Sequence, residues 1–390
     1  MGKGSEKGKI AEEGRIFVLD EGTRRPFMRG IMIHSLMSRG VSYEDAFRTA
    51  NAVRERLRGM EVVSREELAR GVAAELGDLP AAEQPLPEKI TVSGEGRSLP
   101  FSKGHLSQSL LAAALDPNDA FDVAREIERA LRRRGMQQID RKALRRLVYE
   151  TLKDRIGSAV AERYLIWRKY QDPEKPVVIL LGGPPGVGKT SLALEVAHRL
   201  GIQRVMSADS IRQVMRLMLS PELVPAIHAS SFEAYRGLGS VALSDDPIME
   251  GFLAQASVVA VGVRAMLDRA VAENTSLVLD GVVILPGLIN LEAYRDLAHV
   301  IFLAVATLDL DAYRNRFSLR AAGEKRRPQQ RYLENLDAIL RIQDYFLELA
   351  DQHDVPIVDN ESFDSSVLSI IRHVSETLRN EESLDVAQWL

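Results

Sequence analysis

The chain has 390 residues, 45% hydrophobic and 27% charged, with a formal net charge of −4. This is the composition of a globular protein of two or three domains. The absence of cysteine excludes disulfides, Cys-based catalysis and Cys-ligated metal centres. The net negative charge argues against a nucleic-acid partner. The lack of a run of about 20 uninterrupted apolar residues argues against a membrane partner. The polar N-terminus predicts a cytoplasmic protein.

Two successive stretches of the N-terminal half repeat one pattern. Phe27 returns as Phe101, and Phe47 returns as Phe121, both 74 residues later (101 − 27 and 121 − 47). Further along, the offset becomes 76, which a two-residue insertion near Gly135 explains. One register kept over so many positions indicates an internal duplication.

Each copy is expected to begin with a β-prone segment, over Ile16–Leu19 and Ile90–Val92, followed by a Pro-Phe turn and helices. The last helix of the first copy opens at Ser64, and Glu67 three residues on completes a capping box. The middle helix of each copy carries an apolar face at helical spacing. Its members are Phe47, Ala50, Val53 and Leu57 in the first copy and Phe121, Ala124, Ile127 and Leu131 in the second.

This repeated pattern resembles the ATP-cone, a small, mostly helical nucleotide-binding module. The resemblance implies an allosteric nucleotide and, because such modules often mediate assembly, a homo-oligomer. The alternative is a duplicated helical domain that docks on the C-terminal half without binding nucleotide.

From Lys175 onward, β-prone apolar runs alternate with amphipathic helical patterns. The predicted strands are Val177–Leu181, Arg204–Ser207, Ser276–Leu279, Val300–Val305 and Val355–Val358. The predicted helices include Ser210–Leu219, Phe252–Val271 and Tyr332–Asp351. Such alternation predicts an α/β fold, a doubly wound parallel sheet with helices on both faces.

The strongest motif is G-G-P-P-G-V-G-K-T at residues 182–190, which contains a full Walker A pattern between a buried strand and a helix. Its glycines allow backbone N–H groups to surround phosphates, Lys189 reaches the β- and γ-phosphates, and Thr190 offers a hydroxyl to Mg²⁺. The motif predicts ATP and Mg²⁺ as cofactors. The expected nucleotide-binding residues are Gly183, Pro184, Pro185, Gly186, Val187, Gly188, Lys189, Thr190 and Ser191.

Two carboxylates are predicted at the same edge of the sheet. Asp280 ends an apolar strand, as a Walker B aspartate does, and is expected near Mg²⁺ together with Thr190. Asp209 follows the second strand, where it can orient a hydroxyl nucleophile and accept its proton, with Arg212 on the same helix face to hold an anion. The alternative for Asp209 is a helix N-cap.

Positive charge gathers in residues 313–331, which we call the arginine-rich segment. It carries seven basic residues and one acidic residue. We expect it to form a lid that closes over phosphates, with Arg316 and Arg320 stabilising the transferring charge as catalytic residues beside Lys189 and Asp209. A solvated helix face is the alternative.

With these motifs in place, the chain from residue 90 on resembles the 2-phosphoglycerate kinase family. The matching stretches include the phosphate loop, S-A-D-S-I-R (207–212), S-P-E-L-V-P-A-I-H-A-S-S (220–231) and R-N-R-F-S-L-R (314–320). The resemblance implies transfer of the γ-phosphate of ATP to the hydroxyl of 2-phosphoglycerate, giving 2,3-bisphosphoglycerate. The expected acceptor-binding residues are Arg212, His228, Ser231, Glu250, Arg326 and Arg327.

Two other functions stay open at this point. One is a P-loop kinase that acts on a different phosphorylated or carboxylated metabolite. The other is a nucleotide-sensing regulator without turnover. The expected organisation is a disordered tail (1–14), a first ATP-cone-like module (15–74), a linker (75–88), a second module (89–152), a helical connector (153–175), a P-loop kinase-like domain (176–378) and a C-terminal tail (379–390).

Overall fold

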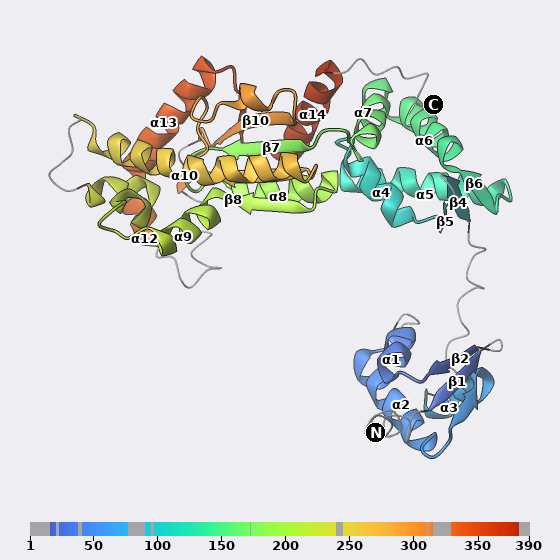
Figure 1. The fold of residues 1–390 in the computed structure, drawn as a ribbon. Coiled ribbons are helices and arrows are strands. Elements are labelled where there is room, and N and C mark those ends of the chain that lie inside the picture. Colours follow the sequence, from blue (N-terminus) through green and yellow to red (C-terminus); the bar gives the residue numbers. More distant parts are fainter. Residues whose placement is uncertain are drawn as a thin grey trace, which may run out of the picture. The chain divides into compact units, whose positions relative to one another are not determined.

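The computed structural model describes residues 16–20, 23–37, 41–76, 90–94, 97–171, 173–238, 245–309, 311, 313–314 and 329–381. The chain divides into two compact units, Met1–Lys89 and Ile90–Leu390. The first unit holds one small α/β module, and the second holds a similar module followed by a larger α/β domain (Figure 1).

The described part of the first unit is a three-stranded sheet with helices. Strand β1 (Phe17–Asp20) pairs antiparallel with β2 (Thr23–Pro26) and parallel with β3 (Val62–Ser64). The helices are α1 (Arg29–Met37), α2 (Tyr43–Arg56) and α3 (Arg65–Leu76). The predicted capping box is confirmed at α3, where the Ser64 hydroxyl accepts from the backbone N–H of Glu67 at 3.2 Å and the Glu67 carboxylate accepts from that of Ser64 at 2.9 Å.

The second module has the same topology. Strand β4 (Thr91–Gly94) pairs antiparallel with β5 (Arg97–Pro100) and parallel with β6 (Gln138–Asp140). Its helices are α4 (Lys103–Leu111), α5 (Pro117–Arg133), α6 (Arg141–Arg155) and α7 (Ser158–Lys169). The β-prone segment expected at the start of each module is confirmed as the first hairpin strand, whereas the second hairpin strand and the third strand of each module were not predicted. Helix α7, expected as a connector, packs into the core of this module through Ala161, Tyr164 and Leu165.

The apolar faces of the two middle helices are buried except at one equivalent position. Phe47 is 38% exposed and Phe121 is 46% exposed, so these two members of the predicted apolar face lie outside the core. Instead, the Arg29 guanidinium lies 5.2 Å from the ring centroid of Phe47, and the Lys103 ammonium lies 5.3 Å from that of Phe121. The duplication therefore preserves a surface cation–π pair, 74 residues apart, rather than a core contact.

The larger domain is built on a parallel five-stranded sheet in the order β11-β10-β7-β9-β8. Its strands are β7 (Val177–Gly182), β8 (Arg204–Ser207), β9 (Leu277–Gly281), β10 (His299–Ala306) and β11 (Ile357–Asp359). All five predicted strands are present, and β11 begins two residues later than expected. The central strand β7 is buried along its whole length, which explains its continuous apolar sequence.

Helices cover both faces of this sheet. Helix α8 (Lys189–Leu200) and α14 (Phe363–Glu381) contact each other and the sheet, whereas α9 (Ala208–Met218), α10 (Pro247–Ala272) and α13 (Leu336–Gln352) form a second group. The predicted helix at 332–351 is two helices, α12 (Gln329–Glu334) and α13. The 3₁₀ segments η1 (Pro225–His228), η2 (Ser231–Gly237) and η4 (Leu291–Tyr294) complete the described elements. Because β8 and β10 lie on opposite sides of β7 and β9, the chain reverses direction beside the end of β7, where such folds bind ligands.

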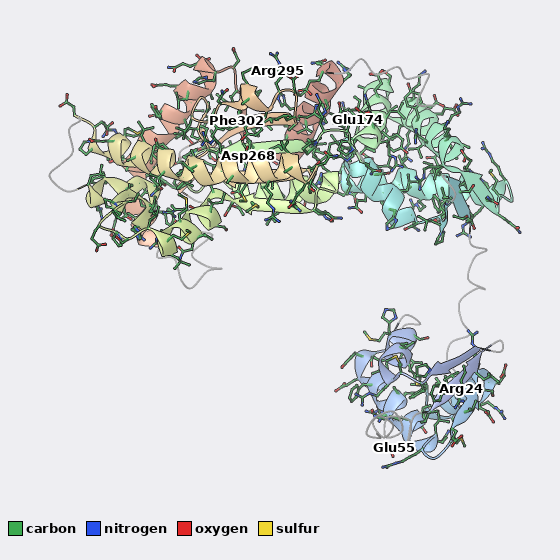
Figure 2. The ribbon with its side chains drawn as sticks, viewed as in Figure 1. Arg24, Glu55, Glu174, Asp268, Arg295 and Phe302 are labelled. Carbon is green, nitrogen blue, oxygen red and sulfur yellow. The ribbon has the colours of Figure 1, made fainter. Side chains whose placement is uncertain are left out.

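Helix α10 is long and apolar enough to cross a membrane, by length and composition alone. In this structure its Phe252, Val259 and Val263 are buried in the core of the domain. On its other side Asp268, labelled in Figure 2, accepts a hydrogen bond from the Tyr294 hydroxyl at 2.6 Å. The apolar sequence of α10 is accounted for by this packing.

Close packing of α10 against η2 depends on Gly251. A Cβ placed there would lie 2.2 Å from the backbone nitrogen of Tyr235 and 2.5 Å from its Cα. We expect Gly251→Ala to lower the free energy of unfolding by about 1–3 kcal/mol, because η2 must shift away. Urea-induced unfolding measures this change.

Gly104→Ala is the matched control, since the nearest atom to its Cβ would be the Ser102 hydroxyl oxygen at 3.7 Å. In helix α4 that substitution is expected to be neutral or to stabilise by up to about 1 kcal/mol. Equal unfolding midpoints for the two variants would contradict the packing account of Gly251.

Candidate active site

The phosphate loop joins β7 to α8 at the carboxyl edge of the sheet. Gly183, Gly186 and Gly188 have φ values of 147°, 90° and 91°, a region that side chains disfavour. A Cβ on Gly183 would lie 2.1 Å from the Val305 carbonyl oxygen. The glycines of the Walker A pattern are therefore required both for the turn and for the close approach to β10.

The strand end below the loop is equally tight. A Cβ on Gly182 would lie 2.5 Å from the Phe346 ring and 3.0 Å from that of Phe302, which is labelled in Figure 2. The register aligns Gly182 with Gly281 on β9. The contacts with Phe302 of β10 and Phe346 of α13, together with the register on β9, therefore fix the point at which the loop leaves the sheet.

Three side chains hold carbonyl groups of the loop. The Lys189 ammonium donates to the Pro184 oxygen at 2.8 Å, and the Asn360 amide donates to the Val187 oxygen at 2.7 Å. The hydroxyl of Tyr313, which is fully buried, donates to the Pro185 oxygen. Because these bonds bind the carbonyl oxygens, the N–H groups are left as the donors of the loop.

Asp280, at the end of β9, lies beside the start of α8. The Thr190 hydroxyl donates to its Oδ2 at 2.7 Å. Its Oδ1 is buried and has no hydrogen-bond partner among the described atoms. Burial raises the pKa of Asp280, and the nearby Asp209 carboxylate adds to that rise, while the Thr190 hydrogen bond and Lys189 oppose it.

These features suit a hard cation such as Mg²⁺. A buried carboxylate oxygen without a partner, next to a hydroxyl and a phosphate-binding loop, supplies two oxygen ligands. In the part of the chain that the structure describes, no group of three or more His, Asp and Glu side chains gathers to form a larger metal cage. Two protein ligands are enough where phosphate oxygens and waters complete the octahedron.

The second predicted carboxylate lies next to the first. Ser207, the last residue of β8, is in register with Asp280, and Asp209 follows two residues later in the first turn of α9. The N-cap of α9 is Ser207, whose hydroxyl accepts from the Ser210 N–H at 3.1 Å. Asp209 is therefore not the cap. Its side chain is 64% exposed.

Arg212 connects α9 to the loop that follows it. Its guanidinium donates to the Asp209 carboxylate at 3.1 Å and to the Ala229 carbonyl. The buried Gln255 of α10 donates to the same carbonyl at 3.1 Å and to that of Ala226 at 2.5 Å. Arg212 thus orients Asp209 while it is itself held by the segment between η1 and η2.

The remaining acceptor candidates lie around this segment. His228 forms a 2.9 Å hydrogen bond with the Leu219 carbonyl at the end of α9, a packing contact of the kind that competes with a ligand role. Ser231 begins η2 and is 8% exposed, and Glu250 lies in the first turn of α10. Arg316, Arg320, Arg326 and Arg327 lie outside the described residues, so the structure does not place them.

Both flanks of the arginine-rich segment are described and both are anchored. On one side Tyr313 binds the phosphate loop, as stated above. On the other, Arg331 forms an ion pair with the buried carboxylate of Glu233 in η2, and the Tyr332 ring lies 5.5 Å from that of Phe232. Glu233 also pairs with Arg236 at 3.1 Å. The segment therefore begins at the phosphate loop and ends beside η2.

Sequence reasoning missed Asn360, Glu233 and the role of Tyr313. Tyr313 and Glu233 have no motif around them. Asn360 directly follows the last predicted strand, at the carboxyl edge, and its position is the one signal that would have placed it near the loop.

Comparison with known proteins agrees with this geometry. The model of the ATP cone domain matches residues 91–173, the second module, and that of the ATPase family associated with various cellular activities matches residues 179–237, which include the phosphate loop. A protein from Pyrococcus horikoshii named 2-phosphoglycerate kinase is 36% identical to this chain, over 74% of this chain and 94% of its own length. A protein of the same name from Methanopyrus kandleri is 34% identical, over 83% of this chain and 99% of its own length.

A third such protein, from Methanothermobacter thermautotrophicus, is 38% identical over 73% of this chain and 94% of its own. Among solved structures, a shikimate kinase from Bacteroides thetaiotaomicron aligns with 52% of this chain and 98% of its own, at 19% identity. Its TM-score of 0.30 is too low to bear on fold or activity.

The buried carboxylate predicts a measurable dependence of stability on pH. Because the folded-state pKa of Asp280 is raised, the stability contributed by its protonated form is lost as pH rises through that pKa. Above that pKa the protein carries a buried negative charge that Asp280→Asn removes. We expect this variant to unfold at a higher temperature than wild type at pH 7, with the gap closing as pH falls below the ordinary carboxyl range.

Thermal unfolding between pH 4 and pH 8 measures the gap, and the same variant should lose about 100-fold or more in kcat because the cation ligand is gone. Asp296→Asn, an exposed substitution away from the site, is the control. A variant less stable than wild type at pH 7 would contradict the pKa direction.

Proposed function

The chain belongs to the 2-phosphoglycerate kinase family, and on that premise we propose that it transfers the γ-phosphate of ATP to the hydroxyl of 2-phosphoglycerate, giving 2,3-bisphosphoglycerate. The observation that carries the proposal is the meeting of a phosphate loop, an unpartnered Asp280 oxygen and the Asp209–Arg212 pair at one edge of the sheet. A nucleotide-sensing protein without turnover would not need the exposed Asp209 carboxylate beside the cation ligands.

Lys189 and the loop amides bind the donor. The Lys189 ammonium donates to a carbonyl of its own loop, that of Pro184. A bound triphosphate offers that ammonium a charged acceptor, so the Lys189 side chain leaves Pro184 and donates to the β- and γ-phosphates. Thr190 and Asp280 would hold Mg²⁺, which, when bound, neutralises charge on the β- and γ-phosphate oxygens.

Asp209 acts on the acceptor. Its exposed carboxylate can accept a hydrogen bond from the acceptor hydroxyl, orient its oxygen toward the γ-phosphorus and take the proton as the new bond forms. Arg212 holds the carboxylate in place through the 3.1 Å contact.

The acceptor presents a carboxylate and a phosphate, so its site must supply positive charge. We assign this role to Arg316, Arg320, Arg326 and Arg327 of the arginine-rich segment. The anchoring of its flanks to the phosphate loop and to Glu233 supports the assignment. Arg212, Ser231 and Glu250 complete the proposed acceptor side together with His228, whose imidazole also binds Leu219.

We further expect the reaction to run in the cytoplasm, with a regulatory nucleotide at the cone-like part of the chain and a homo-oligomeric assembly. The ATP cone match over residues 91–173 supports the regulatory nucleotide.

A coupled assay of ADP release tests the proposed reaction. With Mg²⁺ and ATP, we expect turnover on 2-phosphoglycerate and little on glycerate, 3-phosphoglycerate or phosphoenolpyruvate. Lys189→Ala should lower that turnover by about 1,000-fold, since it removes a charge that stabilises the transferring phosphoryl group. Equal rates on several of these acids would contradict the proposed acceptor, and turnover by Lys189→Ala near that of wild type would contradict the phosphate-loop role.

Asp209→Asn tests the proposed base. We expect kcat to fall by about 100- to 1,000-fold while the KM for ATP stays within about threefold, because the amide cannot accept the proton but leaves the donor site intact. Steady-state kinetics at saturating acceptor measure both values, with Asp296→Asn as the matched substitution. An unchanged kcat would show that Asp209 does not act as the base.

A further inference from the structure

A buried carboxylate on η2 holds two arginines from different parts of the chain. Glu233 is 5% exposed, and it accepts from Arg236 of η2 at 3.1 Å and from Arg331 of α12. The arginine side chains remain about half exposed, at 58% for Arg236 and 49% for Arg331. Since desolvation offsets much of the attraction in such an ion pair, stability alone is a weak reason for it.

The two arginines differ in how many of their N–H groups are already used. Arg236 donates from Nη1 to Glu233. Its Nη2 donates to the Asn335 side chain and its Nε to the Tyr235 hydroxyl, both at 3.4 Å. Arg331 donates from Nη2 to Glu233, whereas its Nε and Nη1 make no hydrogen bond with any residue that the structure describes. Because a guanidinium has five N–H groups in one plane, a second edge of Arg331 is available to an anion.

The charges around the two arginines also differ. Hydrogen bonding to Tyr235 raises the pKa of Arg236, and the carboxylates of Glu233 and Glu334 add to that rise. The hydrogen bond to Glu233 raises the pKa of Arg331, while burial and the positive charge of Arg236 oppose the rise. The two guanidinium groups are therefore close enough to repel each other across one shared carboxylate. A dianion such as a phosphate group relieves this repulsion better than a singly charged carboxylate does.

Other contacts fix the backbone of Arg331 beside η2. Its carbonyl accepts from the Asn335 amide at 2.7 Å. The ring of the next residue, Tyr332, lies 5.5 Å from that of Phe232 in η2. With the start of α12 held in this way, Glu233 has only to orient the guanidinium. A ligand that binds there meets a side chain that is already ordered, which lowers the entropic cost of binding.

The cluster lies close in the chain to the residues that hold the proposed base. The Ala229 carbonyl accepts from Arg212, which also donates to Asp209. Glu233 follows Ala229 by four residues, so their Cα atoms are at most about 14 Å apart. That span is within reach of a small acid held between two long arginine side chains.

We propose that Arg331 binds the phosphate group of the acceptor, and that Glu233 is the positioning residue that orients its guanidinium. The inference rests on the proposed function for the identity of the acceptor. It adds a specificity-determining residue, one that selects phosphorylated acids, to the residues already assigned to the acceptor side.

Binding without turnover tests the role of Arg331. With Mg²⁺ and a non-hydrolysable ATP analogue present, calorimetry measures the Kd for 2-phosphoglycerate and for inorganic phosphate. We expect Arg331→Gln to weaken the binding of both about tenfold or more, since a charged hydrogen-bond donor is lost. A loss for 2-phosphoglycerate alone would assign Arg331 to the acceptor carboxylate and overturn the proposal. Unchanged Kd values, or a wild type that binds neither compound, would also overturn it.

Two other arginines provide the controls. Arg341→Gln removes a half-exposed guanidinium of α13 that pairs with Asp246 at 3.1 Å, and both Kd values should stay within about twofold. Arg236→Gln removes the other partner of Glu233. We expect it to lower the unfolding temperature as Arg331→Gln does, with both Kd values within about threefold. If Arg236→Gln and Arg331→Gln weaken binding equally, Arg331 serves only to hold η2 and the proposal is refuted.

Glu233→Gln tests the positioning role. The amide keeps the shape of the side chain but not its charge, so we expect the KM for the acceptor to rise about threefold to tenfold. The kcat and the KM for ATP should stay within about twofold, because only acceptor binding is affected. In combination with Arg331→Gln, the rise should equal that of Arg331→Gln alone, since Glu233 acts through that side chain. Additive losses would contradict this role.

Failure of the proposed function gives a different result from failure of this site. A wild type that releases no ADP with 2-phosphoglycerate, yet binds inorganic phosphate through Arg331, would refute that function and leave the site standing. An active kinase whose Arg331→Gln variant binds both compounds as tightly as wild type does would refute this site alone.

Discussion

The three hydrogen bonds to carbonyl oxygens of the phosphate loop are the constraint on which the rest of the active site depends. A loop that presents N–H groups to phosphate must direct its carbonyl oxygens elsewhere, and each buried oxygen then needs a donor. Lys189, Tyr313 and Asn360 supply those donors. They come from the start of α8, from the chain after β10 and from the end of β11. The loop is therefore shaped by the assembled sheet rather than by its own glycines alone.

This arrangement also sets the charge balance before any ligand binds. Lys189 is 6% exposed and Asp280 is 3% exposed, so a cation and an anion are held close together away from water. Burial raises the pKa of Asp280, and its Oδ1 has no hydrogen-bond partner among the described atoms. A magnesium–triphosphate complex would supply a metal ion to the Asp280 carboxylate and oxyanions to the Lys189 ammonium. Binding of the donor together with the metal would therefore satisfy both side chains at once.

The sequence predicted the parts of this site that are local in the chain. The Walker A pattern places Lys189 and Thr190, and an apolar strand that ends in Asp280 places the cation ligand, because strand, loop and helix follow one another within a few residues. Glu233, Tyr313 and Asn360 were not predicted, since each acts on a group about 98 to 173 positions away. Short third strands of the modules were missed for the same reason: three residues such as Gln138–Asp140 carry no periodic signal, and only pairing with β4 makes them a strand.

The exposure of Phe47 and Phe121 has a different cause. Helical spacing puts both on the apolar face, yet that face is wider than the surface it covers, and the residue at its edge is left exposed. In each copy a cation lies over the exposed ring, and the two cations, Arg29 and Lys103, are 74 residues apart in the sequence. The duplication thus retained this surface contact while other positions diverged, such as Arg145, which corresponds to Ala69 in the first copy. The second module also packs on α8 through α4, so its residues there serve a contact within the second unit.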